Sequence, residues 1–192
     1  MRYGSERKEQ TRQRIAQAAG KLFRRYGING VGVDAIMREA GLTHGGFYLH
    51  FPSKDALADQ VCADSLSRAA ARWEQTVRNQ KPQEALAEIV ARYLSLEHVE
   101  STERGCLMPA LGPELARRSG SRQAITEALR GMVGALGACM PRRNRERDAL
   151  AKLSCMVGAV LLARLSEDPG LSSEVLQAAR EAVLGGRPLD GS

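Results

Sequence analysis

The sequence of 192 residues has few aromatic side chains, no long apolar run and only isolated cysteines. Its four cysteines form no CxxC pair and no Cys/His cluster, so we expect neither a disulfide framework nor a metal site. No run approaches the ~20 apolar residues of a membrane-spanning helix, and the first residues lack the apolar segment of a secretory signal. We therefore expect reduced thiols and a cytoplasmic protein.

The catalytic motifs GxSxG and HExxH and a phosphate-binding loop are also missing. A thiol hydrolase could pair Cys106 with His98, but no residue is evident as the third, orienting group of such a site. We therefore predict that the chain is not an enzyme and uses no cofactor.

Positive charge is present in excess and is concentrated in the first part of the chain. The formal net charge is +6. Residues 1–60 contain 10 basic and 6 acidic side chains, a net charge of +4, which leaves +2 for the rest of the chain. This distribution is typical of a nucleic-acid-binding segment, although a solvated helix face rich in Arg and Lys would produce it as well.

Apolar side chains recur at helical spacing in nine segments, and no segment alternates as a β-strand does. The expected helices cover residues 5–26, 33–40, 43–51, 53–79, 83–99, 106–116, 121–140, 148–166 and 172–184. The segment 106–116 contains Pro109 and Pro113, so we expect it to be broken or kinked. Residues 142–147 are expected to form a charged turn. The sequence thus predicts an all-α fold.

Residues 40–54, AGLTHGGFYLHFPSK, predict a tight turn followed by a very short helix. Gly41 can supply the left-handed residue that ends one helix, and Thr43 can cap the next by accepting a backbone N–H. Pro52 prevents that helix from running further. Two short helices across a turn of three residues that contains glycine form a helix-turn-helix, whose second member enters the major groove of DNA.

Gly45 and Gly46 lie in the first turn of the short helix, where each costs about 1 kcal/mol relative to alanine. A first turn without side chains lets the backbone approach another surface closely. Its free N–H groups and the positive end of the helix dipole favour a phosphate. We therefore expect this turn to lie against the DNA.

About the first sixty residues resemble the TetR/AcrR family of transcriptional regulators in residue type and spacing. The matching positions are 14–15, 18–19, 22–23, 27, 33–36, 40–41, 46–48, 50–51, 53–54 and 57. The resemblance implies a homodimer with a helix-turn-helix DNA-binding domain in residues 1–54 and a helical ligand-binding and dimerisation domain in residues 55–192. It further implies a repressor that leaves a palindromic double-stranded operator when an inducer binds. A non-DNA-binding adaptor on the same scaffold is an alternative.

The family's pattern also implies roles for single residues of the reading helix. Thr43 and His44 are expected to contact bases, whereas Tyr48 and His50 are expected to hydrogen-bond phosphates. Lys54, at the start of the next helix, is expected to give a charged phosphate contact. Phosphate contacts position such a protein on DNA, while contacts to base edges select the sequence.

The second domain is expected to bind a partner copy and a ligand. The helix 148–166 is apolar on most faces and needs cover on several sides, which the core of the chain itself could provide. The resemblance implies instead that residues 148–184 pair with a second copy, with the small residues Gly158, Ala159 and Ala163 allowing close approach. The scarcity of aromatic residues and of buried charges favours an apolar inducer. The candidate pocket residues are Trp73, Tyr93, Met108, Leu111, Leu129, Met132 and Met156.

Cys106 provides an alternative sensing mechanism. It could begin a helix near Arg104, where exposed N–H groups would lower the pKa of the thiol and favour a reactive thiolate. Oxidation or alkylation would then reshape the pocket and release DNA. The plainer interpretation is that Cys106 is a small buried side chain, as free cysteines more commonly are.

Overall fold

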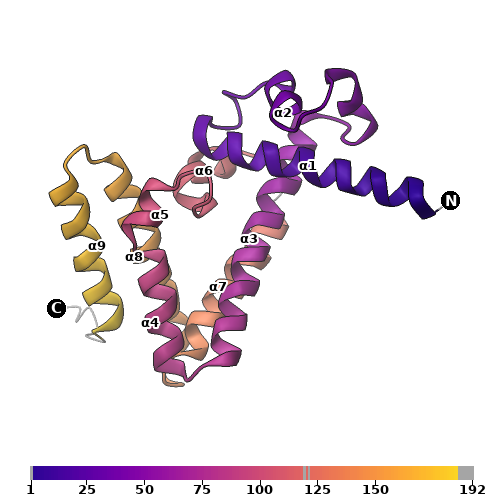
Figure 1. Cartoon of the computed structure of the whole chain (residues 1–192). Helices are drawn as coiled ribbons and strands as arrows, with labels where there is room; N and C mark the ends of the chain where they lie inside the picture. The colour runs from indigo at the N-terminus through magenta and orange to yellow at the C-terminus, as the bar shows by residue number, and fades with distance from the viewer. Residues whose placement is uncertain (1, 119, 121, 186–192) are drawn as a thin grey trace.

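The computed structural model describes residues 2–118, 120 and 122–185, with side chains from residue 6 onward. Over this range it contains helices and no strands, which confirms the predicted all-α fold (Figure 1). The helices are α1 (Arg2–Tyr26), α2 (Val33–Glu39), η1 (His44–Leu49), α3 (Lys54–Asn79), α4 (Pro82–Tyr93), α5 (Leu96–Glu100), α6 (Leu107–Ala116), α7 (Arg122–Ala138), α8 (Arg145–Leu165) and α9 (Pro169–Leu184). Among the described helices, none combines the length and the apolar character needed to cross a bilayer.

The first three helices form a small bundle at one end of the molecule. In Figure 1, α1 lies across this end, with α2 and the turns around η1 above it. α1 packs on α2, and α2 on η1. Their side chains enclose a core that includes Phe23, Ile36, Phe47 and Phe51, each no more than 1% exposed.

The remaining helices form the larger part of the molecule, into which α3 leads. α3 runs along α7, which packs on α8, and α8 packs on α9 (Figure 1). α4 closes the other side by contacting α3 and α9. A continuous hydrophobic cluster extends from Ile15 in α1 to Val183 in α9, so the core does not stop where the first three helices end.

The expected single helix over residues 83–99 is wrong, because the structure divides it into α4 and α5. The break falls at Leu94 and Ser95. The Ser95 hydroxyl accepts a hydrogen bond from the His98 N–H at 3.1 Å. A serine at this position can cap a new helix instead of continuing the old one, and this local bond overrides the apolar periodicity.

The expected break within residues 106–116 is also wrong, since α6 continues through both prolines. Pro109 lies in the first turn, where a backbone N–H would have no partner inside the helix. Pro113 removes one hydrogen bond from the helix interior. The buried stripe of Leu107, Leu111 and Leu115 holds the helix in place despite this loss.

The remaining differences lie at helix ends. α1 begins at Arg2 instead of residue 5, and α9 begins at Pro169, where Asp168 caps its first turn. α8 begins at Arg145, so half of the predicted charged turn is helical. The short third helix is present but has the tighter 3-10 winding, a form that is common in short pieces.

Candidate DNA-binding surface

The turn between α2 and η1 has the geometry expected from its glycine. Gly41 has φ +66°, which confirms that it ends α2 in the left-handed conformation. Arg14 of α1 donates a hydrogen bond to the carbonyl oxygen of the preceding Ala40 at 2.7 Å. This contact fixes the turn on α1. The orientation of η1 relative to α1 follows from it.

Phe47 and Phe51 face the core, and their ring centroids are 5.9 Å apart. The neighbouring Tyr48 points the other way and is 63% exposed. Its ring meets the edge of Phe47, with centroids 5.2 Å apart. The alternation leaves one side of η1 free, and that side carries the residues predicted to contact DNA.

Gly45 and Gly46 have no conformational reason to be glycine. A Cβ added at Gly45 would meet nothing within 4 Å, and one added at Gly46 would meet only the Met37 methyl at 3.6 Å. Neither residue has a positive φ. Both positions would accept alanine within the chain itself, so the absence of side chains matters only to something outside it.

Thr43 and His44 are both exposed at the start of η1. Thr43 occupies the N-cap position, but its hydroxyl accepts no capping hydrogen bond, so the expectation that it caps through its side chain is wrong. His44 Nδ1 contacts the carboxylate of Asp34 in the first turn of α2. The Thr43 hydroxyl is therefore available to a partner, whereas His44 has to exchange or share its contact with Asp34.

His50 lies at the end of η1 and is only partly exposed. Its Nδ1 is buried without a hydrogen-bond partner, so a phosphate contact would have to use Nε2. Its carbonyl oxygen accepts a hydrogen bond from Arg12 at 2.8 Å, and the Arg12 guanidinium also covers the Phe51 ring at 4.5 Å. Arg12 thus anchors the end of η1 to α1, a role that the sequence alone did not reveal.

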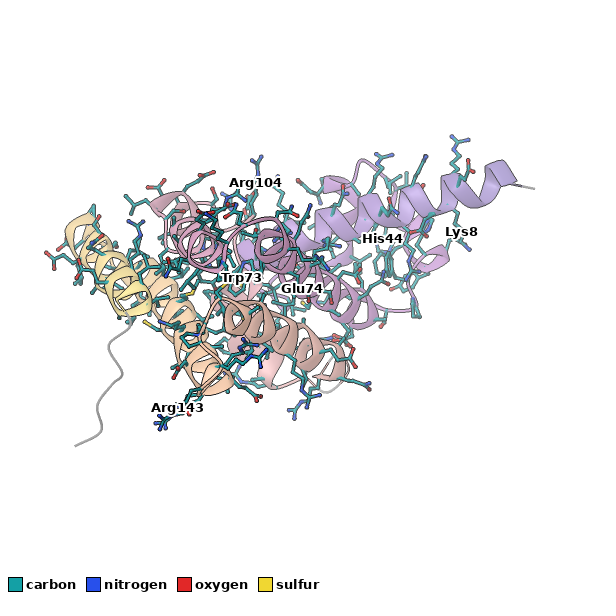
Figure 2. The ribbon with its side chains drawn as sticks, turned by 90° about the horizontal axis from the view of Figure 1, so that it is seen from below. Lys8, His44, Trp73, Glu74, Arg104 and Arg143 are labelled. Carbon is teal, nitrogen blue, oxygen red and sulfur yellow. The ribbon has the colours of Figure 1, made fainter. Side chains whose placement is uncertain are left out.

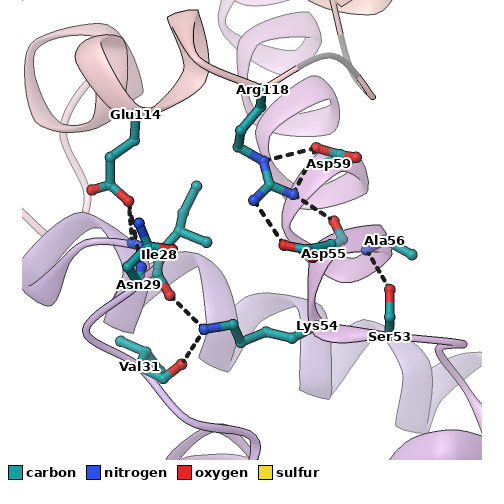
Figure 3. Close-up of polar contacts among 10 residues, drawn as sticks. All are labelled: Ile28, Asn29, Val31, Ser53, Lys54, Asp55, Ala56, Asp59, Glu114 and Arg118. Atoms are coloured by element: carbon teal, nitrogen blue, oxygen red, sulfur yellow. Dashed lines mark hydrogen bonds and ion pairs between the residues drawn. The ribbon is translucent and has the colours of Figure 1, made fainter.

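Lys54 begins α3 and points into the loop between α1 and α2. Its ammonium donates hydrogen bonds to the carbonyl oxygens of Ile28 and Val31, both at 3.0 Å (Figure 3). Since an ammonium has three donors, one remains for a phosphate. The structure therefore gives Lys54 an internal contact beside the predicted external one.

α6, in the larger helical part of the molecule, is attached to the same loop (Figure 3). Glu114 accepts hydrogen bonds from the backbone N–H groups of Ile28 at 3.0 Å and Asn29 at 3.4 Å. Arg118, just after α6, donates to Asp55 at 2.8 Å and to Asp59 at 3.1 Å in the first turns of α3. The pKa of Asp55 is lowered by this contact. These two residues tie α6 to the loop after α1 and to the start of α3, and no local sequence signal identified them.

The predicted pocket residues lie together but mostly inside packed structure. Trp73 and Tyr93 meet edge to face, with centroids 5.7 Å apart. Tyr93, Leu111, Met132 and Met156 are buried, and the partly buried members of the set pack against the same core: Trp73, Cys106, Met108 and Leu129. Two cavities of about 320 and 150 Å³ lie nearby, and of the predicted residues only Cys106 lines either of them.

Cys106 is the N-cap residue of α6, as expected, but its thiol is not activated. Burial raises the pKa of the thiol, so the expected lowering is wrong. The backbone N–H of Cys106 donates to His98 Nε2 at 2.7 Å, and His98 Nδ1 contacts the Tyr93 carbonyl oxygen. Burial also lowers the pKa of His98. Both nitrogens of this imidazole are therefore used to hold α4 and α6 together and do not activate the thiol.

α8 and α9 expose a row of leucines. Leu165 is 71% exposed, and the others are Leu150, Leu161, Leu162, Leu171 and Leu184. Gly158 faces open space on the same side of α8. Ala159 and Ala163, which were expected at a dimer contact, are instead buried within the chain. The helix thus has one side covered by its own domain and another side that remains apolar and uncovered.

A helix-turn-helix joined to a larger set of helices is an architecture typical of DNA-binding regulatory proteins. Residues 15–61 match the family described as bacterial regulatory proteins, tetR family. The HTH-type transcriptional regulator UidR of Escherichia coli (strain K12) is 23% identical over 158 residues, which cover 82% of this chain and 76% of UidR. Residues 15–61 are thus similar to the DNA-binding segment of the tetR family, and the chain is a DNA-binding transcriptional regulator.

Solved structures of similar proteins share the whole fold. The reduced form of E. coli NemR superimposes with a TM-score of 0.79 at 20% identity, covering 92% of this chain and 96% of NemR. A TetR-family regulator from Agrobacterium tumefaciens gives a TM-score of 0.76 at 19% identity, covering 91% of this chain and 98% of that one. Regulators of this family bind DNA operators and small-molecule ligands and act as dimers.

Proposed function

We propose that this regulator is a homodimeric repressor that reads a palindromic operator with residues 43–54 and leaves it when a small molecule binds. The observation that carries the proposal is the outer side of η1. Gly45 and Gly46 leave an open backbone there, and the exposed side chains of Thr43 and Tyr48 stand on either side of it. A surface without an internal role but with donors at a helix start suits a phosphate backbone and base edges.

The roles within this surface follow from its geometry. Tyr48 and Lys54 would contact phosphates, with His50 contributing through Nε2. Thr43 would contact a base directly, and His44 would do so after releasing Asp34. Domain 1–54 would thus bind DNA, while domain 55–192 would sense the ligand and form the dimer.

The dimer is supported by the uncovered leucines of α8 and α9, within the predicted segment 148–184. Exposed apolar patches of this kind mark protein contact sites. Two reading helices related by two-fold symmetry would then meet half-sites about 34–36 Å apart. A ligand that favours a different spacing lowers operator affinity by binding one of two states more tightly.

Thiol sensing through Cys106 receives less support than ligand-relieved repression. A raised thiol pKa leaves little thiolate at neutral pH, and the thiolate is the form that reacts with oxidants and electrophiles. Its position at the start of α6 still matters, because that end of the helix borders a cavity.

Operator binding is tested by gel shift with the DNA upstream of the chain's own gene, against a scrambled duplex of equal length. A dimeric regulator is expected to shift the upstream duplex selectively, with an affinity that falls as salt rises because phosphate contacts release counterions. A non-DNA-binding adaptor gives no selective shift at any salt concentration.

The oligomeric state of the free protein is measured by sedimentation. The wild type is expected to be a dimer, and charged substitutions at Leu161 and Leu165 are expected to yield monomers.

A further inference from the structure

A cavity of about 150 Å³ lies between α1, α3 and the start of α6. Four arginines line it: Arg24, Arg68, Arg72 and Arg104. None of the ten residues that line it carries a carboxylate. The concentration of positive charge around one small cavity calls for a physical explanation.

Arg24 has a structural role in this cluster. It donates hydrogen bonds to the carbonyl oxygens of Gly20 at 2.6 Å and Gly105 at 3.1 Å, and it contacts the Ser65 hydroxyl. Burial lowers the pKa of Arg24, and the charges of Arg68 and Arg72 lower it further. Its guanidinium therefore joins α1, α3 and the loop before α6 and forms one wall of the cavity.

The other three arginines have no internal role. Within the described part of the chain, the guanidinium groups of Arg68, Arg72 and Arg104 make no hydrogen bond and no ion pair. Arg68 and Arg72 are four residues apart on α3, a spacing at which like charges repel each other. An anion shared between them would turn this repulsion into attraction.

Backbone N–H groups add to the positive electrostatic potential around the cavity. Leu107, the first residue of α6, also lines the cavity. The N–H groups of the first helical turn have no carbonyl partner within the helix, and the positive end of the helix dipole lies there. Near Cys106, one guanidinium nitrogen of Arg164 is also buried without a hydrogen-bond partner. The region is rich in donors and poor in acceptors.

This cluster is separate from the surface proposed to read DNA. Arg68 and Arg72 follow Lys54 by 14 and 18 residues on α3, which at 1.5 Å per residue places them roughly 21–27 Å along the helix axis. In Figure 2, Arg104 stands on the upper edge of the molecule, whereas His44 and Lys8 lie toward the N-terminal end of α1. The arginines thus lie well along α3 from the residues proposed to read DNA.

We propose that this arginine cleft, formed by Arg24, Arg68, Arg72 and Arg104, binds a small ligand that carries two or more anionic oxygen groups, either carboxylates or a phosphate. The cavity of about 150 Å³ is several times larger than the volume of about 30 Å³ that a single water occupies, so it has room for such a group. The guanidinium groups of Arg68, Arg72 and Arg104 would bind its oxygens through paired N–H donors. This replaces the expectation of an apolar inducer, whose candidate pocket residues are packed in the core.

The site is connected to the DNA-binding domain through α6, and this part of the inference rests on the proposed function. The first turn of α6 borders the cleft, while Glu114 and Arg118 at its other end hold residues 28–29 and the start of α3. A ligand that draws the start of α6 toward α3 would displace its far end as a rigid element. The loop between α1 and α2 would move with it.

Titration calorimetry on the full-length protein without DNA tests the site, with inorganic phosphate and citrate as the two probes at constant ionic strength. Saturable binding of either probe is expected, and the tighter one identifies phosphate or carboxylate as the preferred group. The double variant Arg68→Gln/Arg72→Gln is expected to bind at least about tenfold more weakly, since each charged hydrogen bond contributes about a factor of ten. Binding of neither probe, or unchanged affinity in this variant, would overturn the proposal.

The matched control is Arg78→Gln/Arg143→Gln, which removes the same charge from exposed positions outside the cleft. It should bind the probe as the wild type does, and an equal loss in the control would show that net charge alone is responsible. Arg68→Lys/Arg72→Lys keeps the charge and should bind with intermediate affinity. A thermal melt of each variant separates lost binding from lost folding.

Fluorescence anisotropy on the operator then tests the coupling. Saturating probe should change operator affinity in the wild type and not in Arg68→Gln/Arg72→Gln. An unchanged operator affinity in the wild type would contradict the regulatory role of the arginine cleft but not its ability to bind the probe. Failure of the proposed function would be recognised separately, because the calorimetry uses no DNA.

Discussion

The outer side of η1 and the arginine cleft both present polar groups without internal partners, but they are assembled differently. The η1 surface consists of neighbours in sequence, residues 43–54, on one short helix and the turn beside it. The cleft draws its arginines from α1, α3 and the loop before α6, which are separated by up to 80 residues. A contiguous surface can be recognised from a local motif, whereas a cleft made of distant segments exists only after the chain has folded.

The largest expected effect is a loss of stability when Phe47, on the buried side of η1, is truncated, and it contrasts with a change on the exposed side. Phe47 is fully buried and Tyr48 beside it is exposed. Phe47→Ala is expected to lower the free energy of unfolding by about 3–5 kcal/mol. Tyr48→Phe should leave it unchanged within about 0.5 kcal/mol, while operator affinity falls about tenfold through the loss of one bond to a charged group. Urea denaturation and anisotropy measure the two effects, and a destabilised Tyr48→Phe would show that Tyr48 belongs to the core.

The contact between α6 and α3 is expected to come next in magnitude. Arg118→Ala removes the partner of Asp55 and Asp59 and should lower the free energy of unfolding by about 1–3 kcal/mol. It should also weaken the effect of any ligand on operator binding, because the second domain loses one of its attachments. Arg117→Ala, at an exposed neighbour without a described contact, is the control.

This contact has a definite pH dependence. The hydrogen bond from Arg118 lowers the pKa of Asp55 below its ordinary value near 3.8. The unfolded chain therefore takes up a proton at Asp55 before the folded chain does, so stability falls with falling pH in the range below about pH 4. The stability difference between wild type and Arg118→Ala should be constant near neutral pH and shrink in acid. A difference that grows in acid would contradict the assignment.

Gly45→Ala is expected to change stability and DNA binding in opposite directions. Alanine fits the folded chain at this position and favours a helix by about 0.5–1 kcal/mol relative to glycine. Its methyl group would at the same time hold the backbone away from DNA. The variant should melt higher and bind the operator more weakly, whereas unaltered operator affinity would show that the open turn does not face DNA.

The smallest expected effect concerns the cleft in the absence of a ligand. Arg68→Gln should raise the free energy of unfolding by about 0.2–0.5 kcal/mol at low salt, because it relieves a like-charge pair on α3. The gain should fade as salt screens the repulsion. Melting curves at two salt concentrations measure it, with Arg78→Gln as the control on the same helix.

Several features of the DNA-binding domain were predictable because their signals are local. Gly41 can take a left-handed conformation at little cost, Ser53 caps α3 through a hydrogen bond from Ala56 at 3.1 Å, and Pro52 limits η1. Each of these effects involves residues within a few positions of one another. The helical spacing of apolar residues, which is also a local signal, predicted the all-α fold.

The contacts between the domains were not predictable from such signals. Glu114 lies 86 positions from Ile28, and nothing in its surroundings in the sequence marks it as a cap for another segment. The family resemblance implied that Ala159 and Ala163 lie at a dimer contact, but which side of α8 is buried within the chain depends on where α7 and α9 pack.

The sequence by itself determined that the chain is helical, where its helix-turn-helix lies and which residues of η1 stand beside the open glycines, since these follow from backbone preferences and short-range spacing. Only the tertiary structure decided that Lys54 also supports the loop between α1 and α2, that the surroundings of Cys106 raise the pKa of its thiol, and that four separate arginines surround one cavity. These features depend on long-range packing, which determines where burial and charge coincide.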